Sequence, residues 1–481
     1  MRRPRVEQPM ATKEIKPADH WVDPATGEYR VVAPGQSFRS ITEKIVRIVL
    51  TPRTPMGWFA LFTLAGGGAT VLLTAVTWLF LKGVGIWAIS QPVAWGFAII
   101  NFVWWIGIGH AGTLISAILL LFKQTWRNAI SRFAEAMTIF AVVCAGMFPL
   151  IHVGRPWLGY WMLPLPFTMN VWPQFRSPLE WDVFAVSTYA TISVVFWYIG
   201  MVPDLATFRD RSQNNFAQYF YGLISLGWRG SVRHWMRYET ASLLLAGLAT
   251  PLVLSVHTVI SFDFAVAVLP GWHTTIFPPY FVAGAIYSGF AMVLTLAIPL
   301  RKFYHLESLV TERHIDNMGK VMLVTGFIVG YGYGMEAFMA WYSADHWEAF
   351  AFWNRMFGPM GWAYWVLIAS NLVIPLTTLW SRKLRTNIAY MFFISIVVNT
   401  GMWFERFVII VTSLYRDFLP SAWGTYRATK WDYMVFVGTL GLFTFLFLLF
   451  VRFLPMIPMN EIRMILPQAK IKPKAAVEAG D

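Results

Sequence analysis

Long apolar stretches separated by short polar connections dominate the chain. A membrane-spanning helix needs about 20 mostly apolar residues, and ten stretches meet this length. They lie at about 57–81, 92–122, 133–153, 180–203, 240–268, 277–300, 319–342, 361–380, 387–414 and 432–454. The pattern therefore predicts an all-α integral membrane protein with about ten transmembrane helices.

The two ends of the chain are more polar than the part between them. Residues 1–56 contain prolines and charges of both signs and lack the apolar core of a cleavable signal peptide, so we expect an N-terminal arm. Residues 455–481 contain Pro and Lys and predict a peripheral tail. Within the membrane domain, 57–454, two four-helix bundles are expected at 92–268 and 277–414, with the first and last spans flanking them.

The basic residues predict the orientation in the membrane. Alternate connections carry roughly twice as many Lys and Arg residues as the others, and such connections face the cytoplasm. Both termini are then cytoplasmic. The links at 155–179 and 343–361, which are rich in Trp and Pro, fall on the outer side, where ordered loops can dock a partner.

Composition excludes several classes of protein. The chain is 57% apolar and 13% charged, which does not describe a soluble protein. Its single cysteine, Cys144, rules out disulfides, thiolate-held iron–sulfur clusters, Cys-rich zinc sites and covalently attached haem c within this polypeptide. The formal charge of +13 comes largely from the connections and does not indicate nucleic-acid binding.

Ionisable side chains near the outer ends of the spans are the first candidates for chemistry, because such groups are costly in a membrane unless paired or solvated. Oxidation of a quinol releases two electrons and two protons, so its hydroxyls need acceptors such as His or a carboxylate. An arginine nearby would keep a carboxylate ionised. Four such residues have similar predicted depth in the membrane, and three neighbouring residues could pack around the quinol ring. They are His152, Asp182, Asp263 and Arg406, with Phe148, Trp161 and Met162. The alternative is that these charges only pair to hold helix ends together.

Five further residues form a candidate proton path between this site and the interior. They are His110, His257, Tyr287, Glu336 and Glu405. A buried histidine that only bonds a neighbouring hydroxyl or carbonyl is an equally good interpretation. A haem b held between His110 and His257 is a further alternative, because paired axial ligands need similar depth on facing helices. No metal site is expected.

Two glycine patterns are explained most simply by packing. Gly66, Gly67 and Gly68 lie in an apolar helix without the lysine of a phosphate loop, so they predict close helix contact. The alternation of Tyr and Gly at 330–334 indicates a tightly packed or irregular part of its helix.

Four motifs resemble the NrfD family, the membrane subunits related to that of polysulfide reductase. They are GHAGTLISA at 109–117, FPLIHVGRPW at 148–157, SPLEWD at 177–182 and SVHTVISFDFA at 255–265. The resemblance covers essentially all ten spans and is strongest toward the larger quinol-oxidising subunit of bacterial alternative complex III. It implies a multi-pass subunit of the bacterial inner membrane, without a covalently bound cofactor, that takes menaquinol or a similar quinol as substrate near the outer face.

The resemblance also implies partners and roles. Electrons would pass to an external iron–sulfur subunit and onward to haem c subunits, and a second NrfD-like subunit would accompany this one. His152 and Asp182 match the positions that take protons from quinol, and Asp263 and Arg406 match less directly.

Three other functions stay open at this stage. The chain could be the sister subunit that does not bind quinol, an ion or proton transporter, or a structural anchor for redox subunits. A transporter would show broken helices near mid-membrane, whereas an anchor would keep full turnover when its outer charges are removed.

Overall fold

The computed structural model describes residues 30–162 and 177–469, and within these ranges the chain is helical and contains no strand. Ten helical segments are long and apolar enough to cross a membrane, which confirms the predicted number. They are α2 (Met56–Lys82), α3 (Phe97–Leu121), α4 (Ser131–His152), α5 (Pro178–Arg211), α7 (Val232–Ala265), α8 (Phe277–Phe303), α9 (Glu312–Tyr342), the combined α11–α12 segment (Gly361–Thr378), α14 (Ile388–Leu414) and α15 (Lys430–Phe453).

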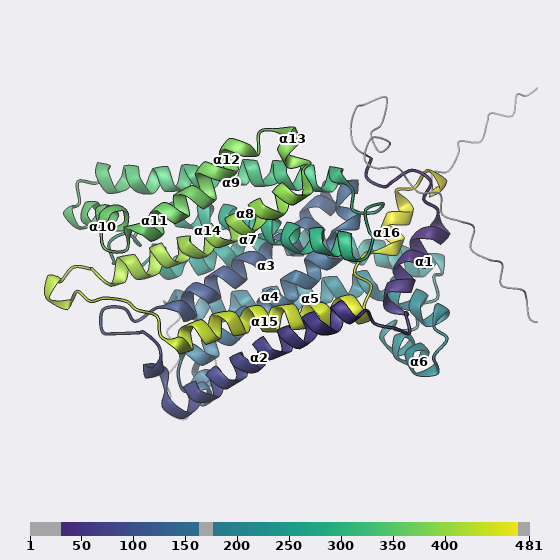
Figure 1. Cartoon of the computed structure of the whole chain (residues 1–481), viewed down its shortest axis with the longest axis horizontal. Helices are drawn as coiled ribbons and strands as arrows, with labels where there is room; N and C mark the ends of the chain where they lie inside the picture. Colours follow the sequence, from purple (N-terminus) through teal and green to yellow (C-terminus); the bar gives the residue numbers. More distant parts are fainter. Residues whose placement is uncertain (1–29, 163–176, 470–481) are drawn as a thin grey trace, which may run out of the picture.

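The spans pack in two sets of four, with one pair at the side (Figure 1). Helices α3, α4, α5 and α7 contact one another and form the first helix group. Helices α8, α9, α11–α12 and α14 form the second helix group, and α3 and α8 join the two. In the most apolar 18-residue stretch of each helix, 83% of the residues of α3 are buried but only 17% of those of α2. Helix α3 therefore lies centrally, and α2 faces outward beside its partner α15.

The short helices mark the two ends of the molecule (Figure 1). Helices α1 (Phe38–Val49), α6 (Asn215–Ile224) and α16 (Met459–Met464) lie at one end, which we call the α1 end. Helix α10 (His346–Phe357) lies at the opposite end, the α10 end. Part of the expected arm is thus a helix, α1, which packs on α16 from the expected tail.

Glycines set how closely the central helices approach. A Cβ atom at Gly112 of α3 would lie 2.0 Å from the carbonyl oxygen of Ala134 on α4, and one at Gly289 of α8 would lie 2.1 Å from the Cβ of Ala111. Gly68 faces Gly441 between α2 and α15 in the same way, at 2.8 Å, which confirms the packing interpretation of this member of the glycine triplet.

We expect Gly112→Ala to destabilise the protein by about 1–3 kcal/mol, the usual cost of overpacking a tight interior contact. Thermal unfolding of the purified chain in detergent measures the effect. Gly146→Ala is the matched control because Gly146 lies within α4 and has open space around its missing Cβ; there the helix preference of Ala should raise stability slightly. Equal melting temperatures for the two variants would contradict the expectation.

Candidate functional site

Two carboxyl groups meet at the α10 end of the first helix group. Asp182 lies in the second turn of α5 and Asp263 in the last turn of α7, and these helices pack together. The two side chains hydrogen-bond each other. Because an ionised carboxylate only accepts hydrogen bonds, this contact requires a proton on one of them. Within the described residues, the Oδ1 atom of each has no other partner. The pair can therefore share one proton, and it keeps free acceptor oxygens.

His152 is the last residue of α4 and lies at the same end of the first helix group. Its ring stacks on Trp87 with centroids 6.4 Å apart, and its buried Nδ1 has no partner among residues 30–162 and 177–469. Phe148, one turn earlier, is fully buried. Arg155 is exposed. The side chains of Trp161 and Met162, expected to wall a quinol ring, lie outside the described part of the structure.

Arg406 has neighbours other than those expected. Its guanidinium forms an ion pair with Glu405 and lies 4.2 Å from the centroid of the Phe281 ring. These residues belong to α14 and α8 of the second helix group. The carboxyl group that Arg406 contacts is thus Glu405 and not Asp182 or Asp263.

His110 and His257 are brought together between α3 and α7. Their ring centroids are 4.6 Å apart, with the rings edge to face. The Nδ1 of His110 lies 2.8 Å from the carbonyl oxygen of Ile106, and a carbonyl only accepts, so this nitrogen carries the proton and Nε2 is the acceptor. A haem between these histidines would require the two rings to separate.

A hydrogen-bonded chain runs through the second helix group from Tyr287 to Glu405. The Tyr287 hydroxyl donates to the carbonyl oxygen of Asn371 at 3.0 Å, and the Asn371 amide donates to the Tyr333 hydroxyl at 2.9 Å. The Tyr333 hydroxyl in turn donates to Glu405. Two of the predicted proton-path residues are thus linked by two that were not predicted.

Local backbone structure explains why Asn371 can serve as this link. It lies in a π-helical turn, Ala369–Val373, between α11 and α12. Pro375 stands four residues later and has no N–H to donate to the Asn371 carbonyl, so that carbonyl is free to accept from Tyr287. Gly401 supplies the space, because a Cβ there would lie 2.2 Å from the Asn371 side-chain oxygen.

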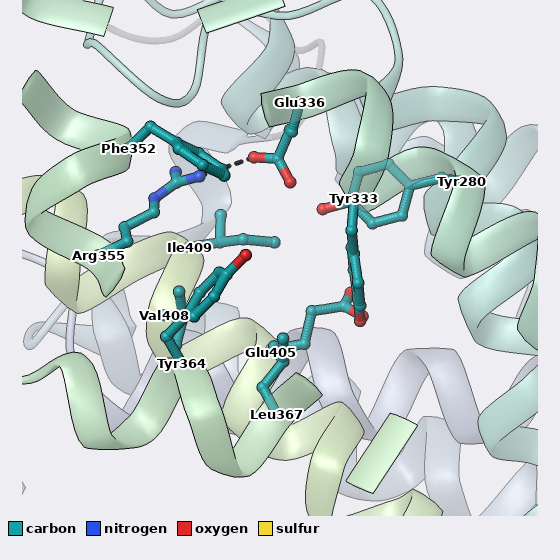
Figure 2. A pocket seen from close by; sticks show the side chains of 10 residues that line it. All are labelled: Tyr280, Tyr333, Glu336, Phe352, Arg355, Tyr364, Leu367, Glu405, Val408 and Ile409. Carbon is teal, nitrogen blue, oxygen red and sulfur yellow. Dashed lines mark hydrogen bonds and ion pairs between the residues drawn. The ribbon is translucent and has the colours of Figure 1, made fainter. Parts of the chain in front are cut away.

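Glu336 pairs with Arg355 of α10 and not with Glu405. The Arg355 Nη1 lies 2.7 Å from the Glu336 Oε1, and both side chains are largely buried. A cavity separates Glu336 from Glu405, and Figure 2 shows Glu336, Tyr280, Tyr364 and Arg355 around it. The volume that water can occupy in this cavity is about 20 Å³.

A larger cleft opens at the α10 end on the other side of the Glu336–Arg355 pair. The volume that water can occupy in this cleft is about 310 Å³. The cleft and the cavity share Glu336, Phe352 and Arg355 in their linings. Glu348 also lines it and accepts from the backbone N–H of Gly271 at 2.8 Å. Burial raises the pKa of Glu348 above its usual value, although this hydrogen bond partly offsets the shift.

The family model of the polysulphide reductase NrfD proteins matches residues 86–416. This is well over half of the chain. The chain belongs to the NrfD family. The matched region begins after α2 and ends before α15, so it contains both helix groups and leaves out the flanking pair.

Three relatives share 20–25% of residues with the chain over most of its length. One, from Halobacterium salinarum, is provisionally named as a dimethyl sulfoxide reductase membrane subunit; it is 25% identical over 79% of this chain and 89% of its own length. The Hdr-like menaquinol oxidoreductase integral membrane subunit of Archaeoglobus fulgidus is 20% identical over 83% and 95%. A selenate reductase subunit of Mesobacillus selenatarsenatis is 21% identical over 78% and 88%.

Four residues that surround the predicted proton path were not identified from the sequence. Tyr333 lies within the Tyr and Gly alternation, where Gly332 indeed packs tightly, its Cβ position being 2.7 Å from the Cβ of Tyr280. The other three are Tyr280, Arg355 and Asn371. A polar residue four positions before a proline within a span was the one available signal, and it marks Asn371.

Proposed function

We propose that this NrfD-family chain oxidises a quinol at the α10 end of its first helix group, as the membrane subunit of an electron-transfer complex. The observation that carries the proposal is the Asp182–Asp263 pair, two buried carboxyl groups in contact that can share one proton and take up another. The partner-free Nδ1 of His152 offers a second acceptor. Two acceptors match the two protons that a quinol releases, and preorganised acceptors of this kind act as general bases.

The name of one relative supports this substrate. One is a menaquinol oxidoreductase subunit, and two belong to the dimethyl sulfoxide and selenate reductases. We propose menaquinol or a similar quinol as substrate here, with the α10 end facing outward as the basic connections predict. Electrons would then leave to an iron–sulfur subunit docked at that end. Membership of alternative complex III, with haem c subunits and a second NrfD-like subunit in a bacterial inner membrane, is the most specific form of this proposal.

Quinone binding to the purified chain tests the proposal directly. Titration with a soluble menaquinone analogue should show binding that His152→Ala and Asp182→Asn each weaken. Glu336→Gln is the control, because this carboxylate lies in the second helix group and should leave the affinity unchanged. An analogue that binds the wild type and the double variant His152→Ala/Asp182→Asn equally well would exclude this site.

We further propose that the candidate proton path described above carries protons. The hydrogen bond from Tyr333 to Glu405 supports this role, as does the contact of His110 with His257. Asn371 positions Tyr287 through its backbone carbonyl and Tyr333 through its side-chain amide. The proton-to-electron ratio of the complex in liposomes tests it. Glu405→Gln should lower the ratio while electron transfer continues; a ratio that equals simple quinol release in the wild type would instead leave these residues a structural role.

A further inference from the structure

The cavity between Glu405 and Glu336 is small and lies among five helices, with several polar groups in its lining. Its lining comes from α8, α9, α10, α11 and α14 (Figure 2). A water molecule needs roughly 10–15 Å³ on this measure and two to four polar partners. The cavity offers about 20 Å³, so it is large enough for one water and too small for a quinol ring.

A polar group without a partner faces this space. The Tyr280 hydroxyl is fully buried and makes no hydrogen bond within the described ranges. Leaving a buried hydroxyl unpaired costs about 1–3 kcal/mol, and a bound water would remove that cost. Glu336 and Glu405 line the same cavity and provide carboxylate oxygens as further partners.

Each carboxylate has its own arginine. Arg406 pairs with Glu405 and Arg355 with Glu336, so each acid can ionise while the other is protonated. The other titratable groups around the cavity are the phenols of Tyr280, Tyr333 and Tyr364. Tyr333 donates to Glu405, and a phenol can relay a proton to a carboxylate through a hydrogen bond.

Glu336 and Arg355 line both the cavity and the cleft at the α10 end, so this ion pair lies between the two. Arg355 is fixed there by the Gly271 carbonyl oxygen at 2.5 Å and the Ser413 hydroxyl at 2.9 Å. Gly271 is required at this contact, since its φ is +77° and a Cβ would lie 2.7 Å from the guanidinium. Of the two acids, Glu336 lines both the cavity and the cleft, whereas Glu405 lines only the cavity.

We infer that the cavity holds an ordered water that bonds Tyr280, Glu405 and Glu336, and that through this water Glu405 exchanges its proton with the medium at the α10 end. In this step a proton leaves the Glu405 carboxyl for the water while the water passes a proton to Glu336, which releases it into the cleft. The water is unchanged, and one negative charge moves from Glu336 to Glu405 between the two arginines. The sequence pattern placed this relay between the quinol site and the interior; the cavity connects it to the α10 end.

This inference deepens the proposed proton path, and it does not depend on the quinol site. Infrared spectroscopy of the purified chain in lipid, without quinol, provides the test. The carboxyl C=O stretching band that Glu405→Gln removes belongs to protonated Glu405, and its shift after transfer to D₂O reports proton exchange. Tyr280→Phe and Glu336→Gln should each slow this shift several-fold.

Asp345→Asn is the matched control. Asp345 lines the cleft but not the cavity, and it caps α10 by accepting from the Trp347 N–H, a role that Asn fills equally well. This variant should exchange as fast as the wild type. The inference is overturned if no band is lost in Glu405→Gln at any pH, or if both Tyr280→Phe and Glu336→Gln exchange at the wild-type rate.

Discussion

Asp182→Asn is expected to lower quinol-driven electron transfer by about 10²- to 10⁴-fold, the usual contribution of a positioned general base. Asn has nearly the shape of Asp but cannot take a proton, so the pair with Asp263 loses its capacity for a second one. Because the defect lies in the chemical step, kcat should fall more than KM rises. Steady-state turnover of the assembled complex with a soluble quinol measures both constants.

Glu180→Gln is the control for this experiment. It removes another carboxylate of α5, two residues away and therefore on a different face of the helix. Turnover should stay close to that of the wild type. If the double variant His152→Ala/Asp182→Asn assembled and turned over at the full rate, quinol oxidation would have to occur elsewhere, and the chain would be an anchor or the sister subunit.

Arg406→Met is expected to have the largest effect on stability. The Arg406 and Glu405 side chains are each no more than 2% exposed, and removal of one partner from a buried ion pair costs about 3–5 kcal/mol because the other charge stays buried alone. Thermal unfolding in detergent measures the loss. A second change, Glu405→Gln, should recover much of it, because a neutral amide needs no counter-charge.

An exposed arginine supplies the comparison. Arg155→Ala removes a guanidinium that lies at the surface near the end of α4, and surface substitutions usually stay within about 0.5 kcal/mol. If Arg406→Met behaved like Arg155→Ala, or if adding Glu405→Gln made it worse, the buried pair would not be a source of stability.

The ten spans could be predicted because a lipid environment requires each one to be both long and apolar. Their ends could not. Helix α5 continues to Arg211 and α7 begins at Val232, well beyond the apolar stretches 180–203 and 240–268, because a helix can extend into water with polar residues. Helix α10 was not predicted at all, since its mixed aromatic and charged sequence lies in a connection.

The candidate site was predicted in part for a related reason. Depth in the membrane follows from counting residues along a span, so Asp182 and Asp263, or His110 and His257, could be matched by level. The direction in which a side chain points around its helix depends on which helices are neighbours, and that is set by packing. The pairing of Arg406 with Glu405, and not with an acid of the first helix group, was therefore not predicted. The Asn371 link, which depends on a π-helical turn, could not be foreseen either.

The pairing of α2 with α15 has a consequence for how the protein is made. Helix α2 is the first of the ten spans to leave the ribosome. Helix α15, which packs against the Gly68 face of α2, is the last. The two helices can therefore meet only after the eight spans between them are synthesised. Until then α2 must remain in the lipid without its partner, which its apolar composition permits. The contact of α2 with α15 therefore cannot form before the last span is made, and it brings the beginning and end of the membrane domain together.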